Sequence, residues 1–73
     1  MLSVLTLGTK VTLNKPYRSI EHGGYVDYRE GVVIETLLGG RYGVRLYNEH
    51  GTYGPPGNPA TVDFSRRELK PQG

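Results

Sequence analysis

The first apolar alternation in the chain lies near its start. In residues 9–13 polar and apolar side chains alternate, and Val11 and Leu13 share one face, which predicts a half-buried β-strand. We expect this strand to end at residues 14–16, where Asn, Lys and Pro follow one another. Residues 17–28 mix aromatic, charged and glycine residues without a sustained period, so they are interpreted as a long loop with strand-like flanks.

The next two apolar stretches are separated only by glycine. Residues 31–38 are β-branched at their start, Gly39-Gly40 follows, and residues 41–47 alternate again. Glycine adopts the positive φ that tight hairpin turns need, so this pattern predicts a β-hairpin. The expected inward positions of the second strand are Tyr42, Val44 and Leu46, whereas Arg45 and Tyr47 lie on the opposite face.

Residues 48–59 hold three glycines and three prolines around Tyr53. This composition predicts an exposed loop that is bent by glycine and stiffened by proline. Alternation resumes in residues 61–65, where Val62 and Phe64 are expected to point inward.

The end of the chain carries a helix-start pattern. Ser65 followed three residues later by Glu68 is a capping box, which predicts one helical turn. Leu69 then returns to the core and Pro71 ends the element. Glycine and proline are too frequent elsewhere for a long helix, because each is costly in a helix interior.

These elements predict an all-β fold, a five-stranded SH3-like small barrel with one 3-10 turn before the last strand. Closure into a barrel suits a chain of 73 residues, because it pairs the edges that a small open sheet leaves free. An OB-fold is the nearest alternative, but it normally needs more chain and a helix. The expected division is an apolar segment at 1–7, a barrel at 8–70 and a tail at 71–73.

Composition limits the class of protein. The chain has no Cys, so no disulfide or thiolate metal site can staple its thin core, and oligomerisation or docking on a partner is expected. Leu2, Val4 and Leu7 in the segment 1–7 are candidates for an edge strand or a contact with another copy. That segment is too short to span a membrane and lacks an export signature, which favours a cytoplasmic protein.

Several short motifs resemble known SH3-like families. Gly8-Thr-Lys-Val11 is similar to the first strand of KOW and Tudor-type barrels, Gly31-Val-Val-Ile34 to their second, and Ser65-Arg-Arg-Glu-Leu69 to their closing turn and strand. The layout over residues 8–70, with Pro16-Tyr17 and Tyr53 in a glycine-rich loop, also resembles the electron-transport accessory group that includes photosystem I reaction-centre subunit IV. The resemblance implies the fold and an accessory-subunit role.

No motif in the chain indicates an enzyme. His22 and His50 each follow a glutamate in a predicted loop, and solvated loop histidines are the favoured interpretation over a metal site. Phosphate-binding and dinucleotide-binding glycine motifs are absent from the sequence. Type II dihydrofolate reductase shares the predicted barrel, but Val62-Asp-Phe-Ser65 lacks the amide and phenol of its active-site strand. We therefore predict no catalytic residue, no metal and no cofactor.

Aromatic and basic residues remain as candidates for recognition. Tyrosine combines rigid contact area with a hydroxyl at small entropic cost, which suits binding to a peptide or protein surface. If the two predicted long loops flank one groove, their tyrosines line it together. Tyr42 is assigned to the core and Tyr25 and Tyr28 are left open between core and surface. The predicted partner-binding residues are Tyr17, Arg18, Tyr25, Tyr28, Arg45, Tyr47, Tyr53, Arg66 and Arg67.

Two functions follow from these candidates. The first is a non-catalytic protein-interaction module or accessory subunit that binds a protein partner through its aromatic loops. The alternative is a nucleic-acid-binding barrel in which tyrosines stack on bases and basic residues hold phosphates. The formal net charge of only +2 favours the protein partner, because a strong nucleic-acid binder usually carries a larger basic excess.

Overall fold

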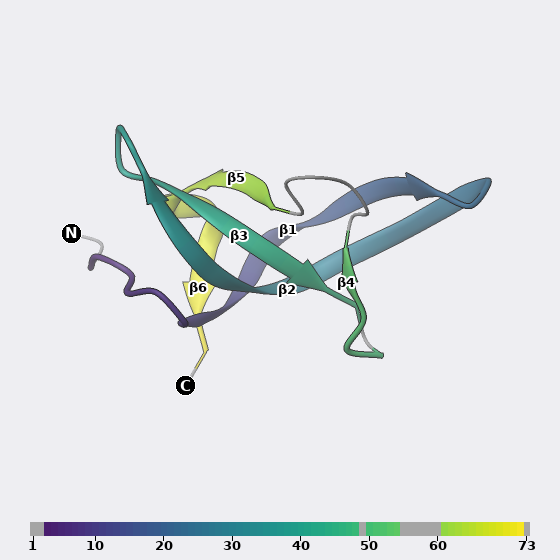
Figure 1. The fold of residues 1–73 in the computed structure, drawn as a ribbon, viewed down its shortest axis with the longest axis horizontal. Coiled ribbons are helices and arrows are strands. Elements are labelled where there is room, and N and C mark those ends of the chain that lie inside the picture. The colour runs from purple at the N-terminus through teal and green to yellow at the C-terminus, as the bar shows by residue number, and fades with distance from the viewer. Residues whose placement is uncertain (1–2, 49, 55–60, 73) are drawn as a thin grey trace.

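The computed structural model describes residues 3–48, 50–54 and 61–72. These residues form six strands and one 3-10 turn (Figure 1). In chain order they are β1 Lys10–Glu21, β2 Gly24–Leu37, β3 Arg41–Tyr47, β4 Tyr53–Gly54, β5 Val62–Ser65, η1 Arg66–Glu68 and β6 Leu69–Pro71. The all-β prediction is therefore confirmed, with one strand more than the five expected, because the two-residue β4 pairs within the segment interpreted as a loop.

All strand pairs are antiparallel, and the sheet runs in the order β4-β3-β2-β1-β6, with β5 also paired to β3. Strands β5 and β6 thus pair with opposite sides of the sheet, and η1 connects them. Pairing between the strands that the structure describes does not close the sheet, so they form an open sheet and not the closed barrel expected from the sequence. Strand β5 pairs with β3, β6 pairs with β1, and η1 carries the chain between these two pairings.

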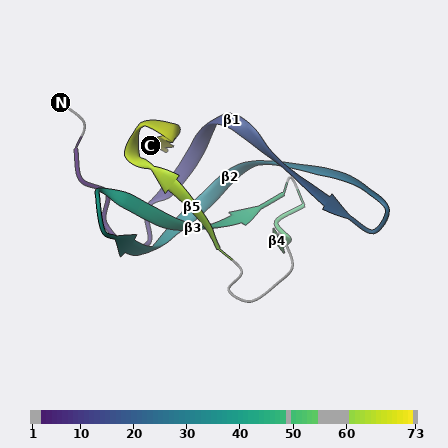
Figure 2. The same cartoon turned by 90° about the horizontal axis from the view of Figure 1, so that it is seen from above.

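Residues 17–21 of β1 pair with residues 24–28 of β2 and form a hairpin, called here the arm. It projects from the rest of the molecule in both views and accounts for the elongated shape of 40 × 24 × 18 Å (Figures 1 and 2). The expectation of a loop at residues 17–28 is wrong. His22 and Gly23 form a two-residue turn with φ of 51° and 80°, the positive values that tight hairpins require.

Pro16 did not end the first strand as predicted, because it lies in an irregular stretch of β1. Thr12 pairs with Glu30 and Tyr17 pairs with Tyr28, so residues 13–16 lie opposite a single residue of β2. Proline is tolerated at such a bulge, where the ladder needs no N–H donor. Strand β1 therefore bends at this point and continues into the arm.

The hairpin predicted around Gly39-Gly40 is confirmed, with both glycines at positive φ. Its second strand buries Tyr42, Val44 and Leu46 as expected, and Val11, Leu13, Phe64 and Leu69 complete the predicted core. Val62 is half-buried against that core. Three further buried side chains, Leu5, Tyr28 and Val33, join the same cluster.

The segment at the chain start packs through one residue. Leu5 is buried, and its N–H donates to the Tyr42 hydroxyl at 3.1 Å. Val4 and Leu7 are exposed, and described residues 3–9 form no strand, so the edge-strand alternative is wrong for them. Leu2 lies outside the described residues.

The turn before the last strand has the predicted cap. The Ser65 N–H donates to Glu68 Oε1 at 2.9 Å, and the Ser65 hydroxyl donates to the same oxygen at 3.0 Å. This pair fixes η1 directly before Leu69, which is 3% exposed. A local sequence pattern thus anchors the segment that carries the chain from one side of the sheet to the other.

Candidate binding groove

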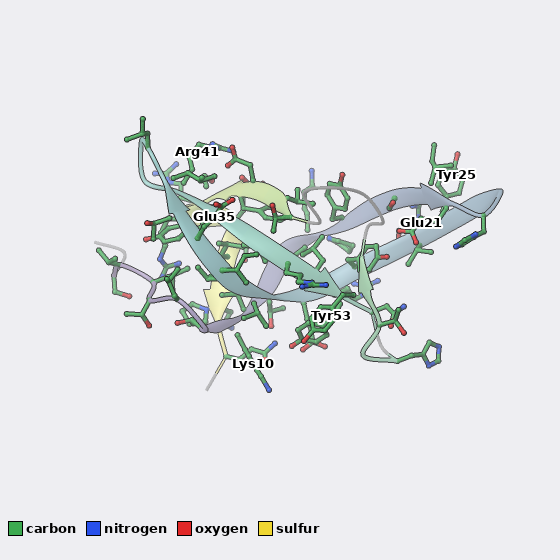
Figure 3. The ribbon with its side chains drawn as sticks, in the orientation of Figure 1. Lys10, Glu21, Tyr25, Glu35, Arg41 and Tyr53 are labelled. Atoms are coloured by element: carbon green, nitrogen blue, oxygen red, sulfur yellow. The ribbon has the colours of Figure 1, made fainter. Side chains whose placement is uncertain are left out.

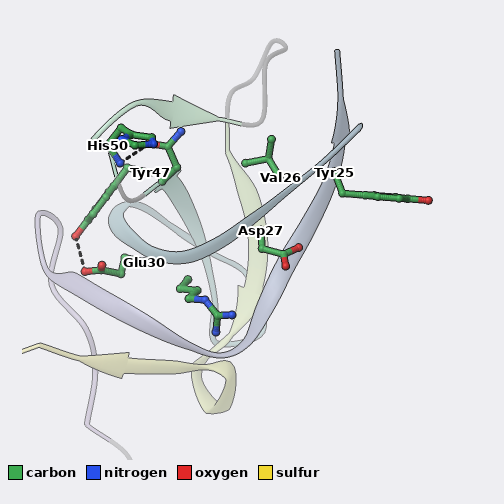
Figure 4. A pocket seen from close by; sticks show the side chains of 8 residues that line it. Tyr25, Val26, Asp27, Glu30, Tyr47 and His50 are labelled. Atoms are coloured by element: carbon green, nitrogen blue, oxygen red, sulfur yellow. Dashed lines mark hydrogen bonds between the residues drawn. The ribbon is translucent and has the colours of Figure 1, made fainter. Parts of the chain in front are cut away.

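A groove of about 470 Å³ lies between the arm and the end of β3 (Figure 4). Its lining residues come from β2, from the last residue of β3 and from the segment that follows β3. They are Tyr25, Val26, Asp27, Arg29, Glu30, Tyr47, Asn48 and His50. The two segments predicted to share one groove, 17–28 and 48–59, both contribute to it.

The groove forms where strands β2 and β3 separate. Pairing between β2 and β3 starts at Glu30 and Tyr47. Beyond this point β2 continues into the arm, where β1 is the strand that pairs with it among the described residues. Beyond Tyr47 the chain turns, since the Asn48 carboxamide oxygen accepts hydrogen bonds from the His50 N–H at 2.9 Å and the Thr52 N–H at 3.0 Å. The turn leaves a recess against the arm.

A polar network forms the inner wall of the groove. The Tyr47 hydroxyl donates to Glu30 Oε2 at 3.3 Å, and Gln72 Nε2 donates to the same oxygen at 2.7 Å. Burial, with the negative charge of Glu30, raises the pKa of Tyr47 above its ordinary value. The network joins β2, β3 and the segment after β6, so this wall is held from three directions.

Aromatic and cationic side chains continue the surface beyond the groove. The Tyr47 and Tyr53 rings meet edge to face, with centroids 6.1 Å apart, and the Arg45 guanidinium lies 4.6 Å from the Tyr53 ring centroid. Tyr53 is 53% exposed. Figure 3 shows its side chain near the end of β3. Three of the predicted binding residues are thus brought together, and only Tyr47 among them lines the groove.

The outer end of the arm has a second such arrangement. Arg18 donates from Nε to Asp27 Oδ1 at 2.8 Å and from Nη2 to Oδ2 at 3.2 Å, and its guanidinium lies 5.2 Å from the Tyr25 ring centroid. Hydrogen bonding to Arg18 lowers the pKa of Asp27. Tyr25 is 68% exposed and projects outward at the rim of the groove, which settles the open choice for this residue in favour of the surface (Figure 4).

Two of the tyrosines predicted to bind a partner pack in or against the core instead. Tyr28 is 2% exposed, so it is a core residue and does not belong to the binding surface. Its hydroxyl donates to Glu21 Oε2 at 2.7 Å, and burial followed by this bond raises its pKa to about 12. Tyr17 is half-buried and packs edge to face on Phe64, with ring centroids 6.2 Å apart.

The basic cluster at η1 lies away from the groove. Arg66 Nε donates to the Ser3 carbonyl at 2.6 Å and its Nη1 donates to the Leu69 carbonyl at 2.7 Å, so this guanidinium ties the chain start to the closing turn. The Arg67 carbonyl accepts a hydrogen bond from the Asn14 carboxamide at 2.5 Å, and its side chain is exposed. Neither residue lines the groove.

Six residues that line the groove were not among the predicted binding residues: Val26, Asp27, Arg29, Glu30, Asn48 and His50. No strand was expected at Arg29, so the sequence pattern did not indicate on which face of a sheet its side chain lies. Asn48 carried a usable pattern, because asparagine commonly accepts bonds from backbone N–H groups one turn ahead.

Within the described ranges, no three His, Asp or Glu side chains gather as metal ligands. His50 lines the groove, and His22 lies in the turn at the tip of the arm. No helix in the part of the chain that the structure describes is long and apolar enough to cross a membrane.

Comparison of the chain with family models, with curated proteins and with solved structures gave no match.

Proposed function

We propose that this chain is a non-catalytic interaction module of the SH3-like type, which binds a segment of a protein partner in the groove between the arm and β3. The observation that carries the proposal is that the groove is lined by both segments that the sequence marks as candidates for recognition. Most small-molecule sites are more enclosed, whereas an open groove beside a β-hairpin accommodates an extended chain.

The SH3-like assignment is supported by element order. Strand β6 pairs with β1, β5 pairs with β3, and the capped turn η1 lies between them. This is the order of a small barrel in which the closing turn carries the chain across the open side of the sheet. Leu69 and Phe64 bury their side chains in one shared core on either side of that turn.

The character of the groove favours a protein over a nucleic acid. Two carboxylates, Asp27 and Glu30, line it beside one guanidinium, Arg29. A groove that follows a phosphate backbone needs a clear excess of positive charge. The exposed pair of Arg45 and Tyr53 lies outside the lining and is the feature that a nucleic-acid alternative would use.

The test is selection from a library of random linear peptides displayed on phage, with the full chain as bait, followed by chemical-shift mapping of each selected peptide. We expect the shifts to concentrate on the groove residues. Replacement Tyr47→Ala is expected to weaken binding by more than about fivefold, since buried tyrosines often dominate such contacts. Ile20→Ala is the matched control, because Ile20 is exposed on the arm but does not line the groove.

Two results would contradict the proposal. One is that no peptide is enriched, or that enriched peptides shift residues away from the groove. The other is that single-stranded oligonucleotides bind there with an affinity that falls steeply as salt rises, which would indicate phosphate neutralisation and favour the alternative.

A further inference from the structure

The inner strand of the arm has an edge that no described residue pairs with. Strand β2 pairs with β1 on one side over its whole arm portion, Gly24–Tyr28, and with β3 on the other side only from Glu30 onward. The second edge of residues 24–28 therefore faces the groove.

The hairpin register identifies which backbone groups point to that edge. In a hairpin closed by a two-residue turn, the pair beside the turn exchanges both hydrogen bonds, and such pairs then alternate along the strands. Counting from Glu21 and Gly24, Val26 and Tyr28 are bonded to β1. Tyr25 and Asp27 direct their N–H and C=O groups to the other edge, and both residues line the groove.

The charged side chains near this edge differ in whether they already have hydrogen-bond partners. Asp27 accepts both hydrogen bonds of Arg18, and Glu30 accepts from Gln72 and Tyr47. Arg29 is exposed, and its positive charge contributes, after Arg18, to lowering the pKa of Asp27. In the described ranges its guanidinium donates no side-chain hydrogen bond and forms no salt bridge. Among the charged groups that line the groove, Arg29 is thus the one whose hydrogen bonding is left open in the described ranges, and its guanidinium complements a carboxylate.

We propose that the groove takes up an extended peptide segment with an acidic side chain, which adds as a β-strand at Tyr25 and Asp27, on the edge of β2 that no described residue pairs with, and pairs its carboxylate with Arg29. This inference rests on the proposed function and specifies its ligand. Strand addition supplies affinity through backbone hydrogen bonds, and the flanking side chains supply selectivity. The new strand would lie in line with β3, in the recess where β3 turns away.

Hydrogen exchange tests the strand addition. Peptides selected from the phage library are added to the full chain, and the exchange rate of each backbone amide is measured by nuclear magnetic resonance. We expect the Tyr25 and Asp27 amides to slow by more than about tenfold on binding, while Val26 and Tyr28, already bonded to β1, change less. In an added strand, alternate N–H groups point toward β2 and away from it. N-methylation of the residues whose N–H groups point toward β2 is therefore expected to abolish binding, and N-methylation of the residues between them is expected to leave binding intact.

Charge reversal tests the acidic ligand. Every selected peptide is expected to contain Asp or Glu, and Arg29→Glu is expected to lower affinity by about fivefold or more and to favour a peptide with Lys in place of the acid. Arg67→Glu is the matched control, because it reverses an exposed arginine that lies outside the groove.

The possible results distinguish failure of this inference from failure of the proposed interaction module. Peptides that shift the groove residues but leave Tyr25 and Asp27 exchange unchanged, or that lack acids and ignore Arg29→Glu, overturn strand addition or the acidic ligand while the interaction module stands. Failure to enrich any groove-binding peptide overturns both.

Discussion

The Tyr28 phenol occupies the space that a side chain on Gly54 would need. A Cβ atom built on Gly54 would overlap the Tyr28 hydroxyl, and it would lie 2.6 Å from Cζ of the same ring. The ring thereby passes under β4 and reaches Glu21 on β1. This contact connects the arm, β4 and the core, so it sets the position of the arm beside the groove.

Replacement Gly54→Ala is expected to destabilise the fold by about 1–3 kcal/mol, the usual cost of forcing an extra methyl group into a packed site. Gly24→Ala is the control, since a Cβ there meets no atom closer than 4.0 Å. Urea unfolding of both variants gives the comparison. Equal stability of the two would mean that the Tyr28 ring does not occupy this position.

Alkaline pH is expected to destabilise the protein through Tyr28. Burial raises the pKa of Tyr28 in the folded protein to about 12 from the ordinary value of 10.0, so the unfolded chain ionises first. The stabilisation is fully present below pH 10 and is lost as pH rises toward 12, up to about 3 kcal/mol in total. Unfolding free energies of wild type and Tyr28→Phe, measured over this range, are expected to converge as pH rises; a constant difference would contradict the shift.

Phe64→Ala and Tyr53→Ala are expected to differ strongly in how much stability they cost. Phe64→Ala removes a core ring and is expected to cost about 3–5 kcal/mol, which is enough to unfold a domain of this size. Tyr53→Ala removes an exposed ring and is expected to change stability by less than about 1 kcal/mol. Thermal unfolding followed by circular dichroism distinguishes them. Loss of folding in Tyr53→Ala would place that ring in the core.

Arg66→Ala is expected to release the chain start, because Arg66 donates to the Ser3 carbonyl and also holds the Leu69 carbonyl. The expected loss of stability is about 1–2 kcal/mol, reduced from the value for buried charged hydrogen bonds by solvent screening. Hydrogen exchange at the Leu5 amide, which donates to Tyr42, reports the release directly. Arg67→Ala should leave this amide protected, and an equal effect of both variants would indicate a general charge effect.

Local patterns predicted those elements whose stabilising contacts lie close in sequence. The hairpin at Gly39-Gly40 depends on glycine conformation, and the turn at Ser65 depends on a partner three residues away. The alternating faces that contain Val11 and Phe64 depend only on the two-residue period of a strand. Each of these was confirmed because the physics that selects it operates within a few residues.

The arm could not be recognised in this way. Its strands lack an apolar period, since one face is solvated and the other contacts Phe64 through Tyr17 and Gly54 through Tyr28. Pairing along the hairpin and a turn at His22 hold it together, and these stabilise strands whatever their hydrophobic pattern.

The sequence by itself determined the class of fold, most of the core and the residue types available for recognition, because the burial period of strands and the geometry of glycine turns are local properties. Only the tertiary structure decided which of those residues share a surface. It buried Tyr28, committed Arg66 to the chain start and placed the exposed Arg29 in the groove. These outcomes depend on which distant segments meet, and strand register and packing fix that rather than composition.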